Sequence, residues 1–295
     1  MIGYRPQPVQ LLFLYNVSMM TIQNTSLYNA LLQRTSVRRY QKEPLSAGIL
    51  DRVRELPRSV IPLVPDNDFH VTFRDDMRVD RNMLRSFGAY GAIVNPPHAL
   101  IPYIIGKRHP LLDWGFRTQQ LMIAITQLGL GSCYIGVVGR QASVRRRLNL
   151  PGDAHLGAFL IFGKPLRTIA DPAAKRKRLS FPDFFFNGSF DQPAHPPEDL
   201  LPILAAAQAA PSAVNTQPWR FLWQEPWLHL FVKRNNRSYL SHANQPYRHV
   251  DGGIVMANIS LTLQALNMSA PWSFATTLPP YPPELEHLAS IALRA

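Results

Sequence analysis

The sequence predicts an α+β protein made of two diverged α+β half-domains, packed as a pseudo-dimer with long central helices. Stretches with apolar residues at helical spacing alternate with short stretches in which every second residue is apolar. Two long helices share one plan, since Asp113 and Asp251 each stand sixteen residues before a helix-ending residue, Gly129 or Asn267. At 295 residues the chain is long for one ordinary domain and short for three.

The elements of the first half are expected in the order helix, helix, strand, strand, helix, strand, helix, strand. The helices lie near residues 27–31, 49–56, 114–128 and 144–148, and the strands near 69–73, 99–105, 132–136 and 156–162. Pro57 stops the second helix, and Gly129 is placed to end the long one. Pro102 argues that its strand lies at a sheet edge or carries a bulge.

The second half is expected to contain a helix over 198–209, a loop, a strand near 228–232 and a long helix over 251–267. The last twenty residues are rich in proline, and no element is predicted there. The segment Arg34-Thr35-Ser36 with Tyr40 is echoed by Arg178-Leu179-Ser180 with Phe184. We therefore predict an N-terminal extension over 1–24, either an incorrectly assigned start or a loose segment, followed by halves over 25–172 and 173–295.

Composition argues against several classes of function. The net charge of +12 permits binding to nucleic acid or an anionic surface, but the basic residues fall in separate clusters without a recognition motif. No apolar run reaches the roughly 18 residues of a membrane span. The single cysteine, Cys133, fits a small core residue in a reducing cytoplasm. We expect a cytoplasmic protein that binds neither nucleic acid nor membrane and has no metal site, because no His, Cys and Asp cluster has ligand spacing.

The segment 210–221, which reads A-P-S-A-V-N-T-Q-P-W-R-F, is the most specific feature of the sequence. As a plain Pro/Ser/Asn cluster it would be a turn between a helix and a strand. Its order resembles the flavin-contacting loop of the nitroreductase family, whose members carry FMN and are usually homodimers. The resemblance implies a nitroreductase-like fold and assigns cofactor-binding roles to Pro211, Ser212, Ala213 and Asn215.

The segment 34–38 resembles the R-x-S-x-R/K signature near the start of nitroreductases. Arg34 offers a forked, permanently charged donor for phosphate oxygens, and Thr35 and Ser36 stand beside it with short hydroxyls. The family places the second cation, here Arg38, near the N1/O2 edge of the flavin, where positive charge stabilises the reduced ring. A solvated basic helix end is the alternative interpretation of this segment alone.

Two further stretches match the family. Residues 129–136 resemble its G-L-G-x-x-x-I-G element, which implies that the backbone of Gly136 and Val137 faces flavin N5. Arg176 and Arg178 align with cationic residues that reach the cofactor phosphate in relatives, although a charge run is usually just solvated.

The two halves differ in complementary ways. The first keeps Arg34 and Arg38 but has 57–61 where the loop belongs, with Ile61 in the place of Asn215. The second keeps the loop but has Pro182 where Arg38 should be. The resemblance therefore implies one composite site in a fused single chain, which we expect to act as a monomer and an intramolecular pseudo-dimer.

These features predict an FMN-dependent oxidoreductase that takes hydride from NAD(P)H and passes it, by a ping-pong mechanism, to a small electron-poor acceptor such as a nitroaromatic or a quinone. No side chain is expected to be catalytic, because the flavin carries the chemistry. NAD(P)H would bind transiently, since no G-x-G-x-x-G motif is present. The alternative is a flavin-binding or sensory protein whose reductase activity has decayed.

Overall fold

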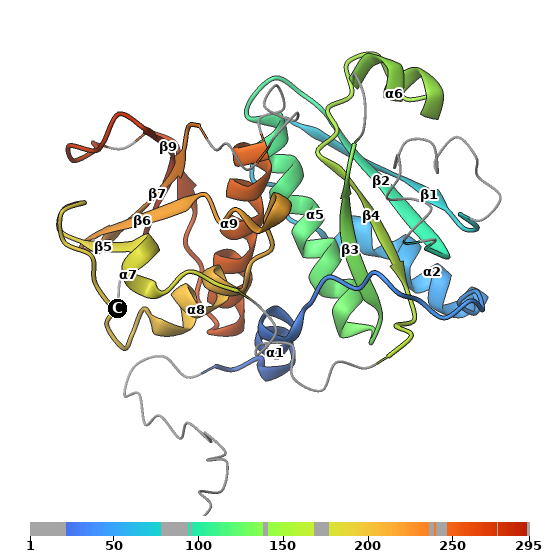
Figure 1. Cartoon of the computed structure of the whole chain (residues 1–295), viewed down its shortest axis with the longest axis horizontal. Coiled ribbons are helices and arrows are strands. Elements are labelled where there is room, and N and C mark those ends of the chain that lie inside the picture. The colour runs from blue at the N-terminus through green and yellow to red at the C-terminus, as the bar shows by residue number, and fades with distance from the viewer. Residues whose placement is uncertain are drawn as a thin grey trace, which may run out of the picture.

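The computed structural model describes residues 22–77, 94, 96–137, 141–167, 177–235, 239, 247–275 and 277–293. Two β-sheets lie on opposite sides of a central pair of long helices (Figure 1). The predicted α+β class is thus confirmed. Most of the predicted N-terminal extension lies outside the described residues, but the amides of Gln23 and Asn24 donate to the carbonyl of Ala265 at 2.8 and 3.0 Å.

The first sheet is antiparallel throughout, with the strand order β1-β2-β4-β3. Its strands are β1 (Asp68–Arg74), β2 (His98–Ile105), β3 (Gly131–Gly136) and β4 (Ala158–Gly163). The helical elements of this part are α1 (Thr25–Gln33), α2 (Ala47–Glu55), the 3-10 turn η1 (Leu56–Ser59), α5 (Pro110–Gln127) and α6 (Gln141–Leu148).

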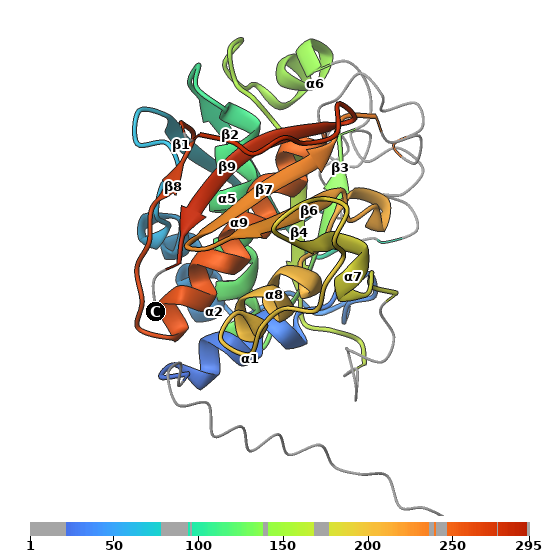
Figure 2. The ribbon, with the colours of Figure 1, turned by 90° about the vertical axis from the view of Figure 1, so that its left-hand side faces the viewer.

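The second sheet has the order β5-β6-β7-β9-β8, and only β5 runs parallel to its neighbour (Figure 2). Its strands are β5 (Phe185–Asn187), β6 (Trp219–Gln224), β7 (Trp227–Lys233), β8 (Trp272–Ser273) and β9 (Leu285–Ala292). Its helical elements are α7 (Phe181–Phe184), α8 (Leu201–Ala209), the 3-10 turn η2 (Ala213–Asn215) and α9 (Tyr247–Ala265).

The two sheets repeat one topology. In the first, a hairpin leads through α5 to an edge strand and then to a strand that inserts between them. The order β1-β2-β4-β3 around α5 corresponds element by element to β6-β7-β9-β8 around α9. This correspondence supports the interpretation of two diverged copies, whose boundaries stay a prediction.

The long helices cross closely near their beginnings, where the sequence places matched glycines. A Cβ on Gly115 would lie 2.2 Å from the carbonyl oxygen of Val250, and one on Gly253 would lie 1.9 Å from that of Leu112. Any side chain at either position would therefore force the helices apart.

Both long helices also end in the same way. Gly129 and Asn267 adopt left-handed backbone conformations, with φ of 75° and 58°. One residue later, the amides of Leu130 and Met268 donate back across the helix end, at 3.2 and 2.8 Å. The prediction that Gly129 ends the helix is confirmed.

Most predicted elements are present, with shifted ends. The helix expected from 251 begins at Tyr247 and the one expected from 198 begins at Leu201. Strand β2 lies between β1 and β4, so Pro102 is not in an edge strand. It falls in a gap on the β4 side, after the pair Leu100 and Leu160 and before the bridge of Ile104 to His155. The expectation of no element near the C-terminus is wrong, because β9 lies between β7 and β8.

Candidate functional site

A cleft of about 290 Å³ opens where the segment after α1 faces the loop between α8 and β6. Ten residues from three stretches of the chain line it: Arg34, Thr35, Ser36, Arg38, Lys177, Arg178, Pro211, Ser212, Val214 and Asn215. Eight of them, all except Lys177 and Val214, belong to the predicted cofactor-binding set. Their role in binding stays a prediction.

The first wall of the cleft is an extended segment anchored to β3. Helix α1 ends at Arg34, whose ψ of 124° turns the chain out of the helix. The amide of Val37 then donates to the carbonyl of Ser132 at 2.9 Å. A Cβ on Gly131 would lie 2.6 Å from the side chain of Val37, so glycine is required for this approach.

The two arginines of this wall differ in exposure. Arg34 is only 3% exposed, and its guanidinium contacts the sulfur of Met122 at 3.8 Å. Arg38 is exposed and reaches the cleft from its rim. A buried guanidinium loses little side-chain entropy when it binds an anion, because it is already held in place.

The second wall is the loop 210–218, and its backbone is strained. Val214, Asn215 and Gln217 have φ values of 45°, 58° and 46°. The left-handed region costs a residue other than glycine about 1–2 kcal/mol, and most for a β-branched one such as Val214. The amide of Gln217 donates to the hydroxyl of Ser212 at 2.9 Å, which closes the loop. Strain maintained by the surrounding structure is common at binding sites.

The third wall is held by the second. The Asn215 amide donates to the Lys177 carbonyl at 2.9 Å and accepts a hydrogen bond from the Arg178 guanidinium. Gln217 accepts from the amide of Leu179 at 2.9 Å. The side chain of Asn215 therefore holds the backbone of Lys177 and the guanidinium of Arg178, two residues that line the cleft.

The other predicted site residues lie elsewhere. Ala213 is in the loop but does not line the cleft, and its amide donates inward to Asp251 at 2.9 Å. Gly136 and Val137, at the end of β3, are not among the lining residues. Arg176 lies outside the described residues.

The predicted alignment of the two loops is wrong. Ile61 is 61% exposed and exchanges hydrogen bonds with the amide side chain of Gln120, both at 2.9 Å. The amides that face α5, as Ala213 faces α9, belong to Leu63 and Val64. This geometry aligns Ala213 with Leu63 or Val64, so Ile61 does not take the place of Asn215.

The sequence similarity between the segments at Arg34 and Arg178 predicts that the two arginines are equivalent residues of the two copies, but their positions in the structure do not fit this. Equivalent residues of two copies would lie beside different loops. Instead both arginines line the same cleft, and Arg178 contacts the loop of its own half. Arg178 thus fits the implied phosphate-contacting role better than the role of a second Arg34.

Asp251, which sequence reasoning identified only as a mark of the helix beginning, lies directly behind the loop. Its carboxylate accepts hydrogen bonds from the Ala213 amide at 2.9 Å, the Tyr239 hydroxyl at 2.9 Å and the Thr216 hydroxyl at 3.4 Å. Burial raises the pKa of this carboxyl to about 7, against the lowering effect of its three donors.

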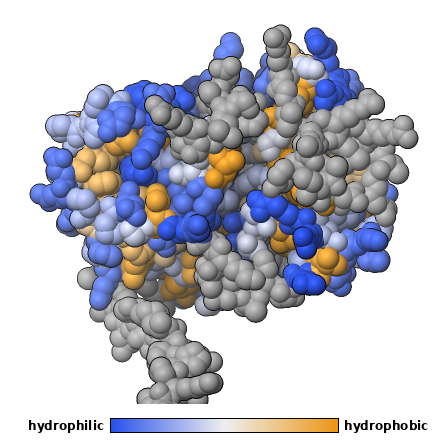
Figure 3. Space-filling model, viewed as in Figure 1, coloured by the Kyte–Doolittle hydropathy of each residue, from blue (hydrophilic) through white to orange (hydrophobic). Residues whose placement is uncertain are grey.

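The lining of the cleft is strongly basic. Among the described residues, four cationic side chains and several hydroxyls line it, and no aspartate or glutamate does. Hydrophilic residues spread across the centre of the face in Figure 3, between the two sheets. Pro211 and Val214 add apolar surface. This lining suits a ligand that combines an anionic group with a flat, partly apolar body.

Comparison with known proteins agrees with this fold. A family model described as "Putative TM nitroreductase" matches residues 26–264. A "putative nitroreductase" from Thermotoga maritima superposes with a TM-score of 0.60 at 17% identity, covering 95% of this chain and 99% of that one. No curated protein matches the sequence.

Other solved structures match part of the chain. NfrA1 of B. megaterium has a TM-score of 0.47 at 19% identity, covering 61% of this chain and 80% of its own. An FMN-dependent nitroreductase from Clostridium difficile has a TM-score of 0.40 at 19% identity, covering 48% of this chain and 89% of its own.

Among the helices that the structure describes, none has the length and apolar character needed to cross a membrane.

Proposed function

Because the chain belongs to this nitroreductase family and has its fold, it is an oxidoreductase of the nitroreductase kind, and we propose that it binds one FMN in the basic cleft. The observation that carries the proposal is the convergence of residues 34–38, 177–178 and 211–215 on one cleft. These stretches come from both sides of the molecule, and two of them resemble the flavin-contacting motifs of the family.

The chemistry of the lining fits the phosphate of FMN. Arg34 is a buried, forked donor, and Lys177 and Arg178 add two further cations to the lining of the same cleft. The hydroxyls of Ser36 and Ser212 can donate to phosphate or ribityl oxygens. Such charge-assisted hydrogen bonds are roughly twice as strong as neutral ones.

The remaining part of the lining fits a flat ring. Pro211 and the 69% exposed side chain of Val214 offer apolar contacts beside the basic groups. Arg38, at the rim, can place positive charge near the ring edge on which negative charge develops when the flavin is reduced. The cleft therefore provides for both ends of the cofactor.

Bound FMN would supply the chemistry, accepting hydride from NAD(P)H and passing it to a small electron-poor acceptor such as a nitroaromatic or a quinone. The chain's own residues bind the phosphate, hold the loop against the ring and set the charge around it. NAD(P)H would bind only transiently, in the same open cleft as the acceptor. It would leave before the acceptor enters, as in a ping-pong reaction.

Two neighbouring arginines allow a matched test. Arg38 and Arg39 are both exposed, but only Arg38 lines the cleft. We expect Arg38→Ala to weaken FMN binding by roughly 5- to 30-fold, the effect of one charge-assisted contact at an exposed site, and Arg39→Ala to change it less than about twofold. Titration followed by flavin fluorescence measures both.

Equal losses in the two variants would mean that general positive charge, and not a formed cleft, attracts the cofactor. Oxidation of NADH or NADPH by the FMN-loaded protein, with a quinone as acceptor, tests the reductase activity separately. Tight FMN binding without such turnover would favour the flavin-binding or sensory alternative.

A further inference from the structure

Two aspartates occupy the same position in the two long helices and hold corresponding loops. Asp113 in α5 accepts hydrogen bonds from the amides of Leu63 and Val64, at 2.9 and 3.3 Å. Asp251 in α9 accepts one from the amide of Ala213 at 2.9 Å. Each carboxylate thus anchors the loop that leads into the first strand of the corresponding hairpin.

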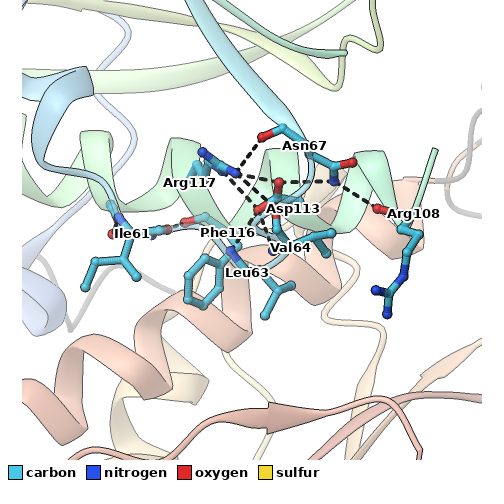
Figure 4. Close-up of polar contacts among 9 residues, drawn as sticks. Ile61, Leu63, Val64, Asn67, Arg108, Asp113, Phe116 and Arg117 are labelled. Carbon is cyan, nitrogen blue, oxygen red and sulfur yellow. Dashed lines mark hydrogen bonds and ion pairs between the residues drawn. The ribbon is translucent and has the colours of Figure 1, made fainter. Parts of the chain in front are cut away.

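The first of these aspartates, Asp113, forms a buried ion pair with an arginine of the same helix. Arg117, one helical turn after Asp113, donates through Nε to both carboxylate oxygens at 3.1 and 3.2 Å. Its Nη2 donates to the carbonyls of Val64 and Asn67 at 3.1 and 2.9 Å (Figure 4). A guanidinium does not titrate in the ordinary pH range, so this anchor contains a permanent positive charge beside its carboxylate.

The second anchor has no such partner among the described residues. Val255 stands four residues after Asp251, where Arg117 stands after Asp113. Asp251 is only 1% exposed, and its side-chain partners are the hydroxyls of Tyr239 and Thr216. It is therefore a buried carboxylate satisfied by neutral donors, at the back of the loop that lines the cleft.

The titratable side chains that face Asp251 in the described structure are tyrosines. Burial raises the pKa of Tyr239 and Tyr134, and raises that of Tyr247 to about 12, so all three stay neutral at ordinary pH. Arg248, an α9 residue whose positive charge lowers the pKa of Tyr239, forms an ion pair with Glu286 at 2.6 Å. With a pKa near 7, Asp251 is the group of this set that changes charge around neutrality.

We propose that Asp251 is a positioning residue, whose ionised form holds the 210–218 loop in the geometry that binds the flavin. The proposal rests on the proposed function. An ionised carboxylate accepts charge-assisted hydrogen bonds from the Ala213 amide and the Thr216 hydroxyl, whereas a protonated one loses that assistance and part of its acceptor capacity. The strained backbone at Val214 and Asn215 would then be held less firmly.

The ionised form of Asp251, which holds the loop for binding, is the form that lowers the stability of the folded protein. Because burial raises the folded-state pKa of Asp251 above its unfolded value, the folded protein takes up a proton between about pH 4 and 7 that the unfolded chain does not. The contribution of Asp251 to stability is thus present at low pH and lost as the pH rises through about 7. A residue with a purely structural role would lower stability when replaced, but neutralising Asp251 should raise it at pH 8.

The decisive variant is Asp251→Asn, with FMN and riboflavin as probes. At pH 8 we expect both flavins to bind about 5- to 10-fold more weakly than to the wild type, while the Tm of the apo-protein rises. At pH 5.5 both differences should shrink. Relief of a repulsion between Asp251 and the phosphate would strengthen the binding of FMN alone. A loss common to FMN and riboflavin, which lacks the phosphate, therefore points to the loop.

Asp113→Asn is the matched control. It leaves Arg117 buried without its counter-charge and should lower the Tm at both pH values. If Asp251→Asn behaves like Asp113→Asn, or binds both flavins as the wild type does at pH 8, the proposal is overturned.

Hydrogen exchange of the Ala213 amide in the apo-protein separates this proposal from the proposed function. Protection, corrected for the intrinsic pH dependence of exchange, should fall in the wild type as the pH drops from 8 to 5.5, and should stay constant in Asp251→Asn. If protection behaves in this way but the protein binds no flavin at any pH, the proposed function is contradicted and the role of Asp251 in holding the loop is not. Protection that is equally pH-dependent in both proteins would overturn the role of Asp251.

Discussion

Replacing Asn215 by glycine should release the Lys177 backbone and the Arg178 guanidinium on the third wall of the cleft, without adding strain at residue 215. Glycine accepts the φ of 58° at this position without the penalty that a leucine would meet. The variant loses the 2.9 Å hydrogen bond to the Lys177 carbonyl and the contact with the Arg178 guanidinium. Each hydrogen bond contributes roughly 0.5–1.5 kcal/mol at an exposed site, so FMN binding should weaken by about 1–2 kcal/mol, or roughly 5- to 30-fold.

Asn267→Gly provides the control, because Asn267 has the same φ of 58° but ends α9 away from the cleft. Both substitutions change the freedom of the unfolded backbone equally, so a lower Tm of apo Asn215→Gly would report its two lost hydrogen bonds. Isothermal titration with FMN gives the two affinities. Equal weakening in the two variants, or normal binding by Asn215→Gly, would refute the view that Asn215 organises the cleft.

Two further predictions concern the fold. Gly253→Ala should lower the Tm sharply, because its methyl group would lie 1.9 Å from the Leu112 carbonyl oxygen. The control Gly48→Ala in α2 meets no atom within 4 Å and should stabilise the protein by about 0.5–1 kcal/mol. Equal shifts of the two variants in thermal unfolding would contradict the close helix crossing. Burial lowers the pKa of His287 to about 4, so the unfolded chain binds a proton between about pH 4 and 6.5 that the folded protein does not, and stability rises with pH there. In urea unfolding His287→Gln should show a smaller rise than the wild type, and an unchanged pH profile would argue against this role.

Much of the fold was predictable because its elements carry strong local patterns. The apolar periodicity of α5 and the alternation of β1 are visible in the sequence, and Gly129 ends its helix as expected. Strand β9 lacks such a pattern. Polar His287 and Ser290 lie among its apolar residues, and a register shift opposite Leu230 and Phe231 of β7 interrupts the alternation. Only the pairing with β7 and β8 reveals it.

The loop alignment failed for a related reason. Residues 57–61 resemble the second loop in local composition, but Pro57 belongs to the 3-10 turn η1. The equivalence is set by hydrogen bonds that backbone amides of the loop donate to Asp113, which lies about fifty residues further along the chain. Local residue order does not encode a contact of that range.

The cleft was predictable in its parts but not in its detail. The motifs identify Arg34, Arg38 and the 211–215 loop, and the structure brings these residues together. Lys177 lies in a charge run whose members cannot be distinguished by sequence. Asp251 is typical of the first turns of a helix, and only its burial against Ala213 and Tyr239 reveals a further role.

The number of FMN molecules that each chain binds at saturation tests most directly whether one composite cleft holds the cofactor. Purified protein would be loaded with FMN, freed of excess and denatured, and the released flavin would be compared with the protein concentration. We expect one FMN per chain, because residues 34–38 and 211–215 form a single cleft. Two per chain would contradict the single site, and none after loading would contradict the flavin assignment itself.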